Sequence, residues 1–161
     1  MINAGSVLFR TSGNGEIGFL GQPLRLDVEN LEVVSGSGGV FFDVGNVNIG
    51  GVSEDVDGIA TSGGDVHIKS TGDVTLNETI STSEQGNGGA INLDADNDIT
   101  ITDSSVELKA GQSININADI DTDGRDIKLN AGSNITTQQL NSSSDEGNAV
   151  SYTHLRAHET S

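Results

Sequence analysis

The chain has 161 residues, of which 24 are acidic and 7 are basic, so its formal net charge is −17. With so few Lys and Arg side chains there is no basic surface that could neutralise phosphates, which argues against nucleic acid and against anionic membranes as partners. There is no Cys, and no apolar run is long enough to cross a membrane as a helix.

The N-terminal part, residues 17–52, predicts β-strands. Apolar residues recur at every second position, so that their side chains share one face of a strand. Pro23 precedes the first of these runs, where a missing N–H does least harm. The alternating apolar sets are Leu24, Leu26 and Val28, then Leu31 and Val33, then Val47 and Ile49.

Phe41 and Phe42 are adjacent in this region. Neighbouring residues of a strand face opposite ways, so we expect one ring on the outside unless a bulge intervenes. The exposed ring is a candidate contact with a neighbouring segment or a ligand; a wide coil or a covering loop is the alternative. His67 lies between Val66 and Ile68 and is expected to face solvent.

The strongest pattern is an internal repeat in four segments, 65–76, 90–101, 105–116 and 126–136. Each has an aliphatic-x-aliphatic strand, a short polar corner and a second aliphatic strand. Steps of 25, 15 and 21 residues separate the segments, a mean of about 20. The steps are counted between the first aliphatic residues of the segments, which are Val66, Ile91, Val106 and Ile127. A third short strand is expected in matching places, at Ile59, Ile80 and Ile120.

Coils of about 20 residues with three short strands predict an all-β fold, a right-handed parallel β-helix. One coil buries too few aliphatic side chains to offset the conformational entropy of ordering it, so coils must stack. Neighbouring coils should lie about 4.8 Å apart, the ordinary strand spacing. We expect residues 1–149 to be a β-helix segment of about seven coils that continues into further coils of a larger protein.

Asp119, Asp121 and Asp123, followed by Gly124, form a D-x-D-x-D-G pattern that is typical of the start of a calcium loop. Asn130 stands where a complete loop would have Glu. Calcium is therefore the one cofactor that the sequence suggests, and a solvated acidic corner is the alternative.

Residues 150–160 read VSYTHLRAHET and resemble a translated sequencing-library adapter. They contain the only Tyr and two of the three His residues of the chain. We expect residues 150–161 to be a non-native, disordered tail and exclude them from the fold.

The repeat region resembles filamentous-haemagglutinin-like adhesins, which are long β-strand-repeat surface proteins of Gram-negative bacteria. The similarity lies in segments 15–18, 23–24, 30–31, 38–43 and 47–52, and in the later Gly-Asp-Val and Ile-Ser-Thr units. The resemblance implies a secreted or cell-surface location, with glycans or proteins of a host or neighbouring cell as partners.

We therefore expect a structural or adhesive segment with no catalytic residues. One alternative is a β-helix enzyme acting on polysaccharides, which needs paired carboxylates or carboxylates with Lys or Arg, and aromatic platforms. The sequence before the tail has no Trp and no Tyr, which argues against that reading. A purely structural stalk or surface-layer repeat is the other alternative, and sequence alone does not separate it from an adhesin.

Overall fold

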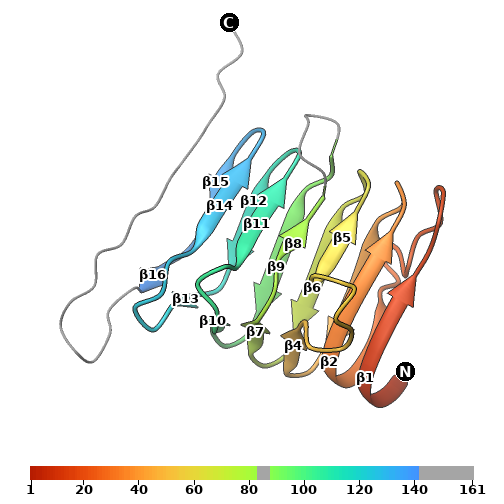
Figure 1. The fold of residues 1–161 in the computed structure, drawn as a ribbon, viewed down its shortest axis with the longest axis horizontal. Helices are drawn as coiled ribbons and strands as arrows, with labels where there is room; N and C mark the ends of the chain where they lie inside the picture. The colour runs from red at the N-terminus through yellow and green to blue at the C-terminus, as the bar shows by residue number, and fades with distance from the viewer. Residues whose placement is uncertain (83–87, 142–161) are drawn as a thin grey trace, which may run out of the picture.

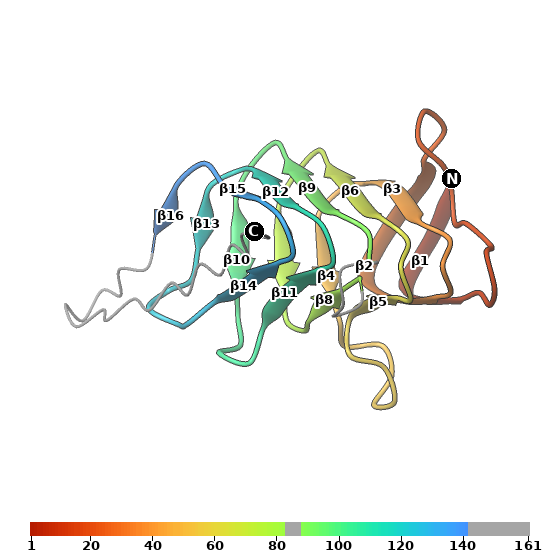
Figure 2. The same ribbon diagram turned by 90° about the horizontal axis from the view of Figure 1, so that it is seen from above.

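The computed structural model of the chain describes residues 1–82 and 88–141. These residues form 16 β-strands and no helix. The strands pair in parallel and stack into a β-solenoid of about six turns (Figure 1 and Figure 2). The predicted all-β, parallel solenoid is thus confirmed, with about six turns rather than seven. Within the described residues there is no helix that could span a membrane.

The first two strands are long, and the later coils are divided into three short strands. Strand β1 (Ile2–Arg10) pairs with β2 (Leu24–Ser35). Strand β2 then pairs in turn with β3 (Val40–Val44), β4 (Val47–Ile49) and β5 (Ile59–Thr61). Three ladders therefore run along the solenoid. The first ladder contains β3 (Val40–Val44), β6 (Val66–Ser70), β9 (Ile91–Ala95), β12 (Ile114–Asn117) and β15 (Ile135–Thr136). The second contains β4 (Val47–Ile49), β7 (Val74–Leu76), β10 (Ile99–Ile101), β13 (Ile120–Asp121) and β16 (Leu140–Asn141). The third contains β5 (Ile59–Thr61), β8 (Ile80–Ser81), β11 (Glu107–Ala110) and β14 (Lys128–Ala131).

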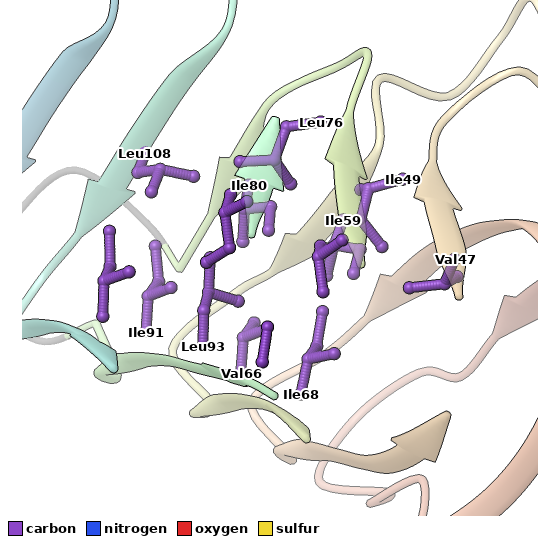
Figure 3. Packing of buried hydrophobic residues seen from close by; sticks show 14 of the residues in the cluster. Val47, Ile49, Ile59, Val66, Ile68, Leu76, Ile80, Ile91, Leu93 and Leu108 are labelled. Atoms are coloured by element: carbon purple, nitrogen blue, oxygen red, sulfur yellow. The ribbon is translucent and has the colours of Figure 1, made fainter. Parts of the chain in front are cut away.

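A single apolar core fills the interior of the coils. In each short strand inward and outward positions alternate, and aliphatic side chains take most of the inward positions. The inward positions at the ends of β5 and β6 hold Thr61 and Ser70, which are also buried. Each fully buried aliphatic side chain contributes about 1.5–3 kcal/mol through the hydrophobic effect. Figure 3 shows side chains from all three ladders converging on this interior, among them Ile49, Ile59, Val66, Ile68, Leu76, Ile80, Ile91 and Leu108.

The assignment of strands to ladders differs from the prediction. Val106 and Ile127 were placed in the ladder of Val66 and Ile91, but Ile91 pairs with Ile114, whereas Leu108 pairs with Ile80 and Leu129. Val106 and Ile127 do line the common core, on the third ladder rather than the first.

The place predicted for Ile120 was wrong for the same reason. It lies in the second ladder, between Ile99 and Leu140, and not opposite Ile80. All three ladders carry the same aliphatic-x-aliphatic pattern, so the pattern does not say which ladder a strand joins. Paired residues are from 18 positions apart (Leu26 and Val44) to 28 positions apart (Ile80 and Leu108).

A column of glycines marks the corner between the third ladder and the first. A Cβ on Gly64 would lie 2.1 Å from the carbonyl oxygen of Gly38, because the backbones of successive coils meet there. At the same corner the Thr61 hydroxyl donates a hydrogen bond of 2.6 Å to the carbonyl of Gly64, which satisfies a buried polar group. The column consists of Gly15, Gly38, Gly64, Gly88 with Gly89, Gly111 and Gly132.

The loop between β4 and β5, residues 50–58, is held by two glutamates from the adjacent coils. Oε1 of Glu32 accepts hydrogen bonds from the N–H groups of Val52 (2.7 Å) and Ser53 (3.1 Å). The Glu78 carboxylate accepts from the N–H groups of Gly51 (3.1 Å) and Gly58 (2.7 Å). Glu32 is completely buried beneath this loop, which Figure 2 shows projecting from the solenoid.

Candidate ligand-binding face

The outer face of strands β3 and β6 carries the predicted contact residue. In β3, Val40, Phe42 and Val44 are buried, so Phe41 and Asp43 face outward. The buried Phe42 ring stacks on the partly buried ring of Phe9 in the first coil, with the ring centroids 5.7 Å apart. The structure therefore places one ring of the Phe41–Phe42 pair inside and the other on the outer face.

Phe41 forms an aromatic pair with His67 of the next coil. Their ring centroids are 6.2 Å apart and the ring planes are tilted by 31°. The Phe41 ring lies over Gly39, where a Cβ would come within 2.7 Å of it, so a glycine at this position leaves room for the ring. Both rings are half-buried. In the described strands after β2, Phe41 is the single large apolar side chain at an outward-facing position.

A column of charged residues runs beside this aromatic pair. Arg25, Asp43, Lys69 and Asp94 lie opposite one another on successive strands. The Nε atom of Arg25 is 3.7 Å from Oδ2 of Asp43. Lys69 is exposed and forms no ion pair with any described residue. A hollow of about 500 Å³ is lined by residues that include Arg25, Asp43, Lys69 and Thr71.

A tight turn projects beside Phe41, and the sequence analysis did not identify it. Phe19 and Gln22 exchange two backbone hydrogen bonds, of 3.3 and 2.9 Å. Phe19 is 50% exposed and Leu20 is 75% exposed. The turn is anchored at Gly18, which has a φ of 68°. The backbones are so close here that a Cβ added at Gly18 would lie 2.3 Å from the Phe41 carbonyl oxygen. The pair of glycines around Phe19-Leu20 was the available signal in the sequence.

The three aspartates of the calcium pattern have protein partners of their own. Asp119 Oδ1 accepts from the Gln139 N–H (3.2 Å), and Asp121 Oδ1 accepts from the Asp123 N–H (2.9 Å). Asp123 Oδ2 accepts from the Arg125 guanidinium at 2.9 Å. Across residues 1–82 and 88–141, no group of three or more His, Cys, Asp or Glu side chains is arranged to hold a metal ion. Calcium binding by Asp119, Asp121 and Asp123 therefore stays a prediction.

A second hollow lies at the corner between the first and second ladders. Its volume is about 340 Å³. The lining includes the carboxylates of Asp94, Asp96, Asp98 and Asp119. These side chains make the corner strongly acidic.

The predicted tail, residues 150–161, lies outside the described residues. No family model, no curated protein and no solved structure matches this chain. The fold by itself defines the class: the chain is a parallel β-solenoid, compatible with β-helix repeat proteins.

Proposed function

We propose that the chain is a structural and adhesive segment of a large secreted or cell-surface repeat protein, of the kind that the filamentous-haemagglutinin-like adhesins represent. In this role the solenoid is a stiff, acidic rod that holds a binding face in place. The observation that carries the proposal is the outward-facing Phe41–His67 ring pair on strands whose other outward positions are polar or charged. The pair gives a partner an aromatic surface to pack on, which the polar outward positions of the other described strands after β2 do not.

The ends of the solenoid support its continuation into further coils. Strand β1 pairs only with β2 among the described strands, so its outer edge keeps unpaired backbone groups. Core residues of the end coils, such as Phe9 and Leu140, are only partly buried, whereas Ile59 and Ile80 of the central coils are fully buried. A further coil at each end would pair the edges and cover these side chains.

The experiment that tests the proposed location uses antibodies raised against the purified chain. Intact and permeabilised cells that produce the parent protein are stained and compared. We expect intact cells to be labelled, and the label to be lost when an external protease treats the cells. Staining that requires permeabilisation contradicts a surface location.

A further inference from the structure

We infer that the outer face of β3 and β6 binds an uncharged glycan, with one sugar ring stacked on the Phe41–His67 pair. The inference rests on the proposed adhesive function and names the class of ligand. The ligand would lie across strands β3, β6 and β9, which are neighbours in the first ladder (Figure 2).

The distribution of aromatic residues is the first argument. Of the four Phe residues in the chain, Phe9 and Phe42 stack in the interior. The other two face outward and are close in the fold, because the turn that carries Phe19 is packed through Gly18 against the Phe41 backbone. Aromatic faces away from the core give a flat apolar surface with a negative quadrupole, on which the C–H face of a pyranose ring packs well.

The polar groups beside the rings are the second argument. Asp43 and Lys69 are two residues further along the same strands as Phe41 and His67, so they lie on the same face, with their Cα atoms about 6.6 Å further along. Asn92 follows His67 in register, and its Oδ1 accepts a 2.9 Å hydrogen bond from Asn115. This bond leaves the Asn92 amide N–H groups as donors.

These groups match the hydrogen-bonding needs of sugar hydroxyls, which both donate and accept. Asp43 supplies an acceptor, whereas Lys69 and Asn92 supply donors. Asp43 and Lys69 also line the hollow of about 500 Å³, which extends along this face toward Arg25 and Thr71.

The net charge decides between classes of glycan. A chain with a formal charge of −17 repels acidic polysaccharides over the whole length of the rod. Arg25 and Lys69 stand opposite Asp43 and Asp94, so the local charges on this face are balanced. An uncharged glycan is not repelled by the acidic rod, and it needs no excess of either charge on this face.

The test is a glycan array that displays neutral and acidic oligosaccharides, probed with the purified chain. The best neutral oligosaccharide is then titrated while the ring and amide NMR signals of His67 are followed. We expect binding to neutral glycans, with His67 among the signals that shift most. Binding to acidic glycans alone, binding to none, or shifts confined to other faces would overturn the inference. None of these outcomes affects the antibody test of surface location. Failure of the glycan site can therefore be distinguished from failure of the proposed surface location.

The variant Phe41→Leu tests the contribution of the Phe41 ring to glycan binding. It keeps an apolar side chain over Gly39 but removes the aromatic face, and we expect affinity to fall about three- to tenfold. Thr100→Ala is the matched control, because Thr100 faces outward on β10 of the second ladder, and it should leave affinity unchanged. Thermal unfolding of both variants checks the fold. Equal affinities of Phe41→Leu and the unmodified chain would also contradict the inference.

Discussion

Backbone contact between coils makes single glycines necessary at the corner that closes each coil. Gly64 does not have a positive φ, so its importance comes from space alone. A Cβ there would meet three backbone atoms of Gly38 and Gly39 within 2.5 Å. Backbone cannot rotate away as a flexible side chain can, so the coils would have to separate locally.

We therefore expect Gly64→Ala to lower the free energy of unfolding by about 1–3 kcal/mol, the usual cost of overpacking. Urea unfolding followed by circular dichroism measures this change. Gly45→Ala is the control, because nothing lies within 4 Å of its Cβ position and its φ is not positive. Similar changes of stability in both variants would show that the corner is no more sensitive to a side chain than an open position.

A local turn on the surface perturbs one carboxyl group. Asp103 Oδ1 accepts hydrogen bonds of 2.8 Å from both the N–H and the hydroxyl of Ser105. These bonds, with the charge of Arg125 as a smaller contribution, hold the pKa of Asp103 below its ordinary value. The folded state therefore gains stability from this group above the ordinary pKa, and the gain is lost as the pH falls through the lower, folded-state pKa.

Ser105→Ala should raise the pKa of Asp103 toward its ordinary value, because it removes the hydroxyl donor and keeps the N–H. NMR titration of the side-chain carboxyl carbon measures this pKa. The neighbouring substitution Ser104→Ala should leave the titration unchanged. A fall in the pKa of Asp103 in Ser105→Ala would contradict the assignment of the donor.

Calcium is the remaining prediction at the residue scale. If Asp119, Asp121 and Asp123 bind the ion, calorimetric titration of chelator-treated protein should release or absorb heat and the melting temperature should rise. Asp121→Asn should abolish both effects, whereas Asp73→Asn, in another coil, should not. Absence of heat and of any change in melting temperature would dismiss calcium.

Among the elements, the β4–β5 loop depends on two carboxylates that lie far from it in sequence. Glu32 has no solvent contact, and its Oε2 atom has no hydrogen-bond partner in the described structure. Burying a carboxylate is costly unless it is hydrogen-bonded, and here the N–H groups of Val52 and Ser53 provide such bonds to Oε1 alone.

Glu32→Ala should therefore free the loop and cost about 1–3 kcal/mol of stability, because two partly buried N–H groups lose their acceptor. Hydrogen exchange at the Val52 and Ser53 amides should accelerate more than exchange in β7. Glu54→Ala, at an exposed position of the same loop, is the control and should change neither quantity. Unchanged exchange in Glu32→Ala would mean that the loop holds its shape without this glutamate.

The strands themselves were predictable, but their partners were only partly so. Period-two alternation identified the strands around Val66, Ile91 and Ile114, because burying one face of a strand dictates that pattern. The error arose at Ala110-Gly111, which resembles the corner at Ser70-Thr71-Gly72 in sequence. In the structure Gly111 belongs to the glycine column, whereas Gly72 packs against Asn46.

The step of 15 residues between Ile91 and Val106 was the available warning, since it is shorter than any observed spacing between paired strands. The hydrogen bonds of Glu32 and Glu78 to the β4–β5 loop were not predictable in this way. They depend on contacts between coils, and local periodicity carries no information about such contacts. The turn at Phe19 is local, and the glycines on either side of Phe19-Leu20 could have indicated it.

For the whole molecule, stability should fall from the centre of the solenoid to its ends. A central coil is covered on both sides, and a terminal coil on one. Ile80 is completely buried between Ile59 and Leu108, whereas Leu140 in the last described coil is only partly buried.

We expect Ile80→Ala to cost about 2–5 kcal/mol and Leu140→Ala about 0.5–1 kcal/mol. Urea unfolding of both variants tests this difference. Equal costs would indicate that the last coil is packed as firmly as the middle of the rod.

The ladders have a mechanical consequence. Their hydrogen bonds join one coil to the next, so they run along the long axis of the rod (Figure 1). A pull between the two ends acts in line with these bonds and peels coils away one at a time. With 21 to 28 residues separating successive strands of the third ladder, each peeled coil would add about 70–100 Å of extended chain. A solenoid loaded in this way should therefore lengthen in steps, one coil at a time, rather than unfold all at once.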